Sequence, residues 1–225
     1  MFSVFTGWAL ALLLGIRHAS EPDHLVAVST LVTDHPSARR AAFQGAVWGV
    51  GHSLSLFAVG SLLLLFRLHL SEHVADGFEF AVGCMLLGLG LRSLKRAIDV
   101  NRTADVKAHT HSHGAHHAHD SLSALQLAKR PLLVGVVHGL AGSGALTALV
   151  LANMPSVTAG LVYMLCFGVG SIIGMSLLSG AAGTPLRWLS QRRSMQAALG
   201  AVAGAMSLAL GVSCAWPIVA RLVLA

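Results

Sequence analysis

Residues 41–66 read AAFQGAVWGVGHSLSLFAVGSLLLLF, a run that contains no Lys, Arg, Asp or Glu. A helix needs about 20 such residues to cross the hydrocarbon core of a membrane. Further apolar runs occupy residues 78–98, 131–152, 157–180 and 195–220. The chain is 55% hydrophobic and only 11% charged, whereas soluble domains are about one quarter charged. The sequence therefore predicts an integral membrane protein built from helices that cross the lipid bilayer.

Residues 2–33 form a sixth predicted span, which is interrupted by the polar cluster RHASEPDH at residues 17–24. We do not expect this segment to be a cleaved signal peptide, because it lacks a basic start and continues apolar beyond the cluster. The predicted fold is therefore an all-α integral membrane protein with six transmembrane helices, the first of which is broken near Pro22.

If the six spans alternate in direction, the 15 Lys and Arg residues divide unevenly between the two faces of the membrane. Arg17 lies within the first span, one face receives Arg67 and Arg221, and the other receives the remaining twelve. Cytoplasmic loops are enriched in Lys and Arg. We therefore expect a multi-pass protein of the cytoplasmic (inner) membrane with both termini outside, and no nucleic-acid partner. The twelve are Arg39, Arg40, Arg92, Lys95, Arg96, Arg102, Lys107, Lys129, Arg130, Arg187, Arg192 and Arg193.

The chain also resembles itself at a spacing of about 120 residues. GIRHA at 15–19 is similar to GVVHG at 135–139, and WGVGH at 48–52 is similar to FGVGS at 167–171. Three spans in each half would give the halves opposite orientations, as in many transporters. The alternative is chance similarity between glycine-rich helices that pack closely. We favour the repeat, with this organisation: a first three-helix repeat at 1–98, a cytoplasmic loop at 99–129 and a second three-helix repeat at 130–225.

The loop between the predicted repeats is rich in histidine. Neutral imidazole binds zinc, nickel, copper and cobalt, and so polar a segment is expected to be disordered without a ligand. We expect weak, multivalent metal binding here, although a solvated polar linker is the simpler alternative. The histidines are His109, His111, His113, His116, His117 and His119.

The most informative residues are His18, Asp23 and His24 in the first span. Ionisable residues at membrane depth are costly and usually mark a pathway. In a straight helix, residues five and six positions apart point in different directions. Pro22 removes the N–H that would bond to the carbonyl of His18, so the helix should kink or unwind there. The interruption could then turn the three side chains toward one cavity.

Ser20 and Asp23 have the spacing of a capping box, which predicts a second half-helix from Ser20 to about Thr33. The dipole of that half-helix would favour Asp23 as a carboxylate. Two imidazoles and a carboxylate suit a divalent first-row metal ion. The alternative is an internal hydrogen-bonded network that holds the kink.

Five further side chains are candidates for the same pathway. His52 lies in the middle of the second span, and its flanking glycines would allow close approach to the first helix, so we expect a fourth metal ligand. A hydrogen bond between helices is the alternative. His138 is the repeat counterpart of His18, and with Ser143 and Thr147 it could line the opposite wall. Glu21 is expected either to pair with Arg17 or to act as a gate.

The pattern His18-x4-Asp23-His24 resembles the H-x4-D-H signature of the nickel/cobalt transporter superfamily. The surrounding residues 15–28, GIRHASEPDHLVAV, and the histidine-rich loop are most similar to its short, six-span members. These include urease-associated nickel permeases and a nickel/cobalt efflux branch. The longer, eight-span permeases carry acidic motifs in later helices that this chain lacks.

The resemblance implies that His18, Asp23 and His24 are essential ligands for Ni²⁺ or Co²⁺ as the transported substrate, without an organic cofactor. It implies an ion-coupled carrier, in keeping with the absence of a phosphate-binding G-x-x-x-x-G-K motif. The expected partners are the lipid bilayer, the divalent metal ion and a cytoplasmic metallochaperone. The direction of transport and the oligomeric state stay open.

Two other functions compete with transport. Histidines and aspartate could hold a catalytic zinc ion in an intramembrane hydrolase, with Glu21 as the acid/base. The chain could also be a metal-binding accessory or sensor protein that does not transport. The repeat suits alternating access better than hydrolysis, so we expect a transporter and not an enzyme.

Overall fold

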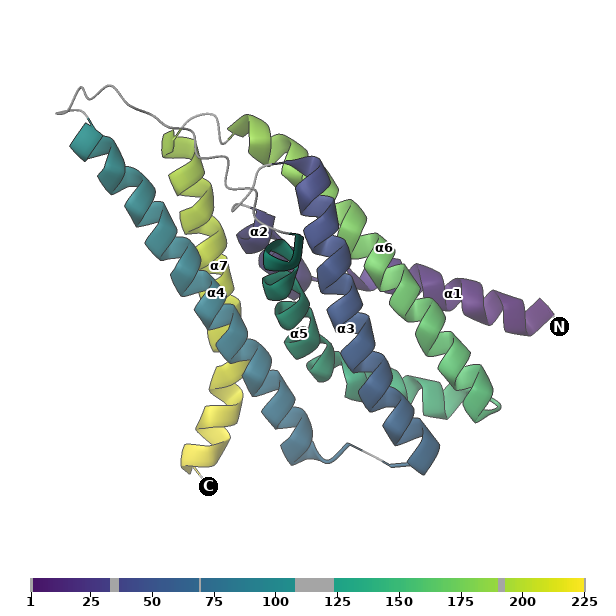
Figure 1. Cartoon of the computed structure of the whole chain (residues 1–225). Coiled ribbons are helices and arrows are strands. Elements are labelled where there is room, and N and C mark those ends of the chain that lie inside the picture. Colours follow the sequence, from purple (N-terminus) through teal and green to yellow (C-terminus); the bar gives the residue numbers. More distant parts are fainter. Residues whose placement is uncertain (1, 33–36, 69, 108–123, 190–192, 225) are drawn as a thin grey trace.

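The computed structural model describes residues 2–32, 37–68, 70–107, 124–189 and 193–224, and within these ranges every regular element is a helix. The all-α prediction is therefore confirmed for the described residues. The six loop histidines lie outside them. Figure 1 labels the helices, which are α1 (Phe2–His18), α2 (Pro22–Val32), α3 (Ala38–Phe66), α4 (Glu72–Lys107), α5 (Ala124–Asn153), α6 (Val157–Leu189) and α7 (Arg193–Leu224).

Four of the described helices are long and apolar enough to cross a membrane. They are Ala38–Phe66, Glu72–Val100, Val157–Gly183 and Ser194–Arg221. α1 and α2 have only 17 and 11 residues, so neither is long enough to cross the hydrocarbon core alone.

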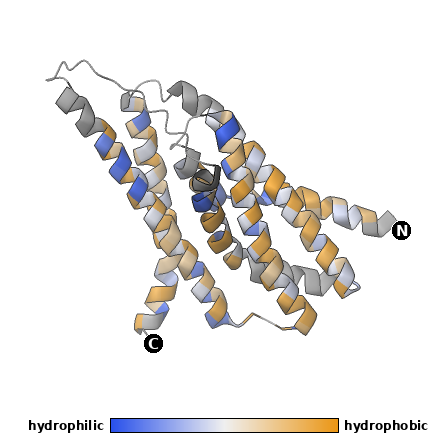
Figure 2. Ribbon diagram, in the orientation of Figure 1, coloured by the Kyte–Doolittle hydropathy of each residue, from blue (hydrophilic) through white to orange (hydrophobic). Residues whose placement is uncertain are grey.

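The outer surface of the bundle is apolar. Leu54, Leu177 and Trp216 expose 61%, 64% and 66% of their surface. Figure 2 shows hydrophobic residues along the length of most helices, with hydrophilic residues gathered near the upper ends of α3 and α4. A water-soluble monomer rarely exposes so much contiguous apolar area. This surface fits lipid, and the prediction of an integral membrane protein is confirmed by these helices.

Polar atoms and close backbone contacts hold the helices together. α3 packs against α5 and α6, α1 packs against α6, and α4 packs against α7. Between α4 and α7, the Ser207 hydroxyl donates to the Leu86 carbonyl at 2.7 Å, and the Ser93 hydroxyl donates to the Gly200 carbonyl at 2.8 Å. Such interhelical bonds contribute about 0.6–2 kcal/mol each in membranes. α4 and α7 therefore form a bonded pair beside the α1–α3–α5–α6 group (Figure 1).

Two glycines bring helix backbones almost into contact. A Cβ atom added at Gly15 of α1 would lie 2.8 Å from the backbone nitrogen of Ser171 in α6. A Cβ atom added at Gly135 of α5 would lie 2.9 Å from the backbone nitrogen of His52 in α3. Real Cβ atoms essentially never come that close, so both positions require glycine. Small residues at helix interfaces are the usual basis of tight packing in membranes.

The first span is broken where the sequence predicts a break, but its restart differs in detail. α1 ends at His18 and α2 begins at Pro22. The predicted capping box at Ser20 is wrong, because the Ser20 hydroxyl donates to the Arg17 carbonyl at 2.6 Å, closing the end of α1. The Glu21 carbonyl instead accepts the first bond of α2, from the Leu25 N–H at 3.0 Å. Pro22 thus occupies the first helical position, where an N–H group would have no partner within the helix and its absence costs no hydrogen bond.

We expect Gly135→Ala to lower the free energy of unfolding by about 1–3 kcal/mol, because overpacking forces the backbones of α3 and α5 apart. Gly88→Ala is the matched control, since a Cβ atom there would meet nothing within 4 Å. The measurement is the thermal melting midpoint of the purified protein in detergent. Equal melting of the two variants would contradict the proposed close contact.

Candidate metal centre

Side chains from four helices meet around one cavity in the middle of the bundle. His18 ends α1, Asp23 and His24 lie in the first turn of α2, His52 comes from α3 and His138 from α5. All five line a cavity of about 420 Å³. His24, His52 and His138 are almost fully buried, with 1%, 0% and 3% of their surface exposed.

Asp23 connects two of these histidines. One carboxylate oxygen accepts from Nδ1 of His24 at 3.1 Å, and the other accepts from Nε2 of His138 at 2.8 Å. Each imidazole that donates one N–H keeps a lone pair on its other nitrogen. The remaining nitrogens, Nε2 of His24 and Nδ1 of His138, are buried and have no hydrogen-bond partner. A carboxylate behind a histidine is the usual support of a metal-binding imidazole.

Glu21 supports His18 in the same way. The Nδ1 atom of His18 lies 3.0 Å from the Glu21 carboxylate. Its other nitrogen, Nε2, lies 3.2 Å from Nε2 of His52. Glu21 was expected to pair with Arg17 or to act as a gate, and the ion-pair distance that the structure gives for it is to His18.

The spacing of the donor atoms suits a metal ion. His18, His24 and His52 each offer a nitrogen, and these atoms lie within 4.8 Å of one another. Asp23, His24 and His138 form a second such set. With metal–nitrogen bonds of about 2.1 Å, two neighbouring ligands on one ion lie roughly 3–3.4 Å apart. The 3.2 Å between His18 and His52 falls in this range.

An unpaired buried nitrogen normally costs free energy, because it has lost its bond to water. In addition to the nitrogens of His24 and His138, Nδ1 of His52 is buried without a partner. Native proteins leave few such atoms, and those they leave often have a functional explanation. A cation that accepted lone pairs from these imidazoles would remove part of that cost. His24 is common to both donor sets, so it is the central residue of the candidate site.

The glycines beside His52 work differently from the sequence-based expectation. Gly51 was predicted to bring α3 close to the first helix, but a Cβ atom there would meet the backbone of Leu132 in α5. Gly139 of α5 packs in turn against the carbonyl of His52. The close approach therefore joins α3 to α5, and it places His52 and His138 in the same cavity wall.

For the remaining predicted site residues, Ser143 and Thr147, the structure describes the helix but not the side chains. Ser143 and Thr147 belong to α5, but their side chains lie outside the described residues. Sequence reasoning missed Glu79 and Cys214, which line the cavity from α4 and α7. A glutamate inside a predicted span is a detectable signal of function. Cys214 gives no such signal, because a single cysteine in a span is usually a packing residue.

Comparison with known families matches residues 4–223 to NicO, described as high-affinity nickel-transport proteins. This chain belongs to that family. The match covers nearly the whole chain and confirms the resemblance carried by His18, Asp23 and His24. The family consists of transporters, which excludes the zinc hydrolase alternative.

Three relatives have about the same sequence identity with this chain. It is 31% identical over 207 residues to the urease accessory protein UreH of Bacillus sp. (strain TB-90), covering 90% of this chain and 87% of the relative. It is 30% identical to the Arabidopsis thaliana chloroplast proteins FOR GROWTH AND FERTILITY 2 and 1, covering 69% and 81% of this chain. The chain spans 41% and 50% of those two proteins. No solved structure matches it significantly.

We expect Asp23→Asn to weaken nickel binding to the purified protein about 10–100-fold, the usual effect of removing the support of a ligand. The substitution removes the negative charge and leaves the shape unchanged. Asp76→Asn is the control, because Asp76 forms an ion pair with Arg221 at 2.8 Å and does not line the cavity. The measurement is titration calorimetry with Ni²⁺. Unchanged affinity in the Asp23 variant would contradict its supporting role.

Proposed function

We propose that this protein is a secondary transporter that moves Ni²⁺ or Co²⁺ across the cytoplasmic membrane through the site around His24. The observation that carries the proposal is the convergence of His18, Asp23, His24, His52 and His138 on one cavity. The buried, unpaired nitrogens of His24, His52 and His138 offer a cation ligands that water otherwise supplies. Membership of the nickel-transport family supports the same cargo.

The affinity of nitrogen and carboxylate donors for divalent first-row ions rises from cobalt to nickel to copper. At a site of this composition nickel should therefore bind more tightly than cobalt. The site has no thiolate among its five donors, which disfavours the soft ions. Nickel is accordingly the first cargo to test, with cobalt second.

Alternating access requires two halves that can move against each other, and we infer that these halves are inverted repeats. Gly15 packs on the backbone of Phe167, and Gly135 packs on the backbone of Trp48. Gly15 corresponds to Gly135, and Trp48 corresponds to Phe167, at spacings of 120 and 119 residues. Exchanging the two halves therefore turns the Gly15–Phe167 contact into the Gly135–Trp48 contact.

The pairing of α4 with α7 supports the same relation. Gly83 packs on the carbonyl of Gly211, and Gly90 packs on the carbonyl of Gly204. A spacing of 121 residues relates Gly83 to Gly204 and Gly90 to Gly211. Exchange of the halves therefore maps one contact onto the other, as a pseudo-two-fold axis requires.

The candidate site lies on this axis. His18 contacts the ring of Phe167, with centroids 5.3 Å apart, and His138 contacts the ring of Trp48, with centroids 5.9 Å apart. His18 and His138 are repeat counterparts, as are the two aromatic residues. Transporters built from inverted repeats bind their substrate near the midplane at the repeat interface.

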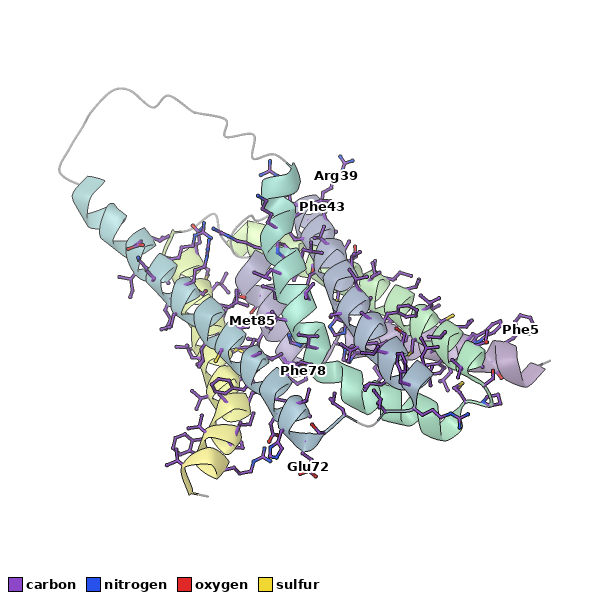
Figure 3. All side chains as sticks on the ribbon, turned by 60° about the horizontal axis from the view of Figure 1, so that its bottom comes forward. Phe5, Arg39, Phe43, Glu72, Phe78 and Met85 are labelled. Atoms are coloured by element: carbon purple, nitrogen blue, oxygen red, sulfur yellow. The ribbon has the colours of Figure 1, made fainter. Side chains whose placement is uncertain are left out.

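The same relation supports six spans, with α1 and α2 together as the counterpart of α5. Figure 3 shows Arg39 and Glu72 at opposite ends of the bundle. The end that carries Arg39, Arg92 and Arg130 is expected to face the cytoplasm. Both termini then lie outside, and the repeats occupy residues 1–98 and 130–225 on either side of the loop.

The test is metal accumulation in cells that express the wild type or His18→Ala. We expect the wild type to change nickel accumulation and, to a smaller degree, that of cobalt, and the variant to lose the change. The sign of the change gives the direction of transport. His73→Ala is the control, because this histidine begins α4 and does not line the cavity. If nickel, cobalt, manganese and zinc all accumulate as in empty cells, the protein is not their transporter.

The loop histidines are expected to bind metal weakly and to tune transport. Deletion of residues 109–119 should shift the nickel concentration for half-maximal transport and leave the maximal rate measurable. The reason is that the main donors lie on α1, α2, α3 and α5. Complete loss of transport, with the protein still in the membrane, would place an essential site in the loop.

A further inference from the structure

The cavity has an outer part that the five central side chains do not account for. Its wall includes Glu79 and Val82 from α4, and Ser213, Cys214 and Pro217 from α7. These residues lie toward the end of the bundle where α4 begins and the chain ends (Figure 1). The cavity therefore connects the central histidines with the α4–α7 pair at that end.

Glu79 is the unusual member of this wall. It lies seven residues inside α4, within the apolar stretch Glu72–Val100. An ionisable side chain in a membrane span is expensive and usually has a function. One turn earlier, the charge of Asp76 is neutralised by Arg221 at 2.8 Å. Among the described residues Glu79 has no such partner, and its side chain is exposed at the cavity.

The charge of the cavity is one-sided. Three carboxylates line it, those of Glu21, Asp23 and Glu79, and none of the described residues that line it is Lys or Arg. A cleft lined by one sign of charge, with walls of low dielectric constant, focuses its field and concentrates counter-ions. Of the three carboxylates, Glu21 contacts His18 and Asp23 contacts His24. Among the described residues, Glu79 is the one of these three carboxylates that makes no contact with a histidine.

A second cavity shows the opposite charge. It measures about 230 Å³ and lies between α2, α4 and α5, nearer the end that carries the basic residues. Arg92 and Arg130 line it, together with Thr30 and Ser93. A dication approaching from that end meets two basic side chains, whereas at the α4–α7 mouth it meets the carboxylate of Glu79.

We propose that Glu79 is the access carboxylate of the metal centre, the first protein group that exchanges the divalent cation between water at the α4–α7 end and the central histidines. This proposal rests on the proposed transport of a divalent cation. Glu79 is a positioning residue that acts through its charge on arrival and departure of the ion, while the histidines, supported by Asp23, hold it.

The first test is initial Ni²⁺ flux into proteoliposomes of the wild type, Glu79→Gln, Glu79→Asp and Glu72→Gln. At low ionic strength we expect Glu79→Gln to raise KM about five-fold, as for a steering charge, with kcat unchanged. The effect should shrink below about two-fold at roughly 0.5 M salt, where charges are screened within a few ångström. Glu79→Asp should resemble the wild type. Glu72→Gln, with the same charge change outside the cavity, should have no effect.

The second test measures the charge of the cavity without transport. In a Cys84→Ser, Cys166→Ser background, Cys214 is the remaining cysteine and lines the cavity. We expect a cationic thiosulfonate reagent to modify it faster than an anionic reagent of similar size. Glu79→Gln should lower this rate ratio several-fold, and Glu72→Gln should leave it unchanged.

The two tests separate the two proposals. Absence of nickel flux in the wild type, with a rate ratio at Cys214 that depends on Glu79, would overturn the transport of nickel and leave the acidic mouth in place. Nickel flux in the wild type, with Glu79→Gln equal to wild type in KM and in rate ratio, would overturn the role of Glu79. A loss of kcat at unchanged KM that does not depend on salt would also overturn it.

Discussion

The missing N–H of Pro22 is the constraint on which the centre of this structure depends. A continuous helix would leave His18 and His24 on different faces, and the bilayer would offer no water to satisfy either of them. The break is supported locally. The Ser20 hydroxyl closes the end of α1, and the Glu21 carbonyl opens α2. With the chain turned in this way, the ring centroids of His18 and His24 lie 4.5 Å apart. Two histidines six residues apart thus become neighbours in one cavity.

The break alone would give an incomplete site, and glycine contacts supply the rest. Because Gly135 and Gly139 have no side chains, the backbones of α5 and α3 touch at His52. This contact brings His52 toward His18 and lets His138 reach Asp23. Packing and chemistry are therefore coupled, since a methyl group at Gly135 would move two of the five donors. A stabilising contact and the geometry of the candidate site depend on the same few atoms.

Much of this arrangement follows from the sequence. The parts that do not follow from it depend on packing between distant residues or on a choice between local partners. Apolar length gives the spans, and proline chemistry gives the break near residue 20, because both are local properties. The contact of His138 with Asp23 joins residues 115 positions apart. The proposed repeat pointed to His138 as a wall residue, but only packing shows that it reaches the carboxylate. The capping box failed for a local reason: Ser20 had two possible partners nearby in the chain, and spacing alone favoured the wrong one.

The proposed two-fold relation holds for the packing of the two halves but not for the chemistry of the centre. Close backbone contacts come in exchanged pairs, so the scaffold of the two halves is matched. The chemistry is not, since Ser143 and Gly144 stand where the first half has Asp23 and His24, and Ser171 stands where it has His52. A duplicated full set would crowd two aspartates and six histidines around one axis, more donors than a single first-row ion can use. In the proposed site the first half supplies His18, Asp23, His24 and His52 and the second half supplies His138, which would give one ion position. In the proposed carrier, matched packing would permit motion between the halves, while unmatched ligands would keep the site single.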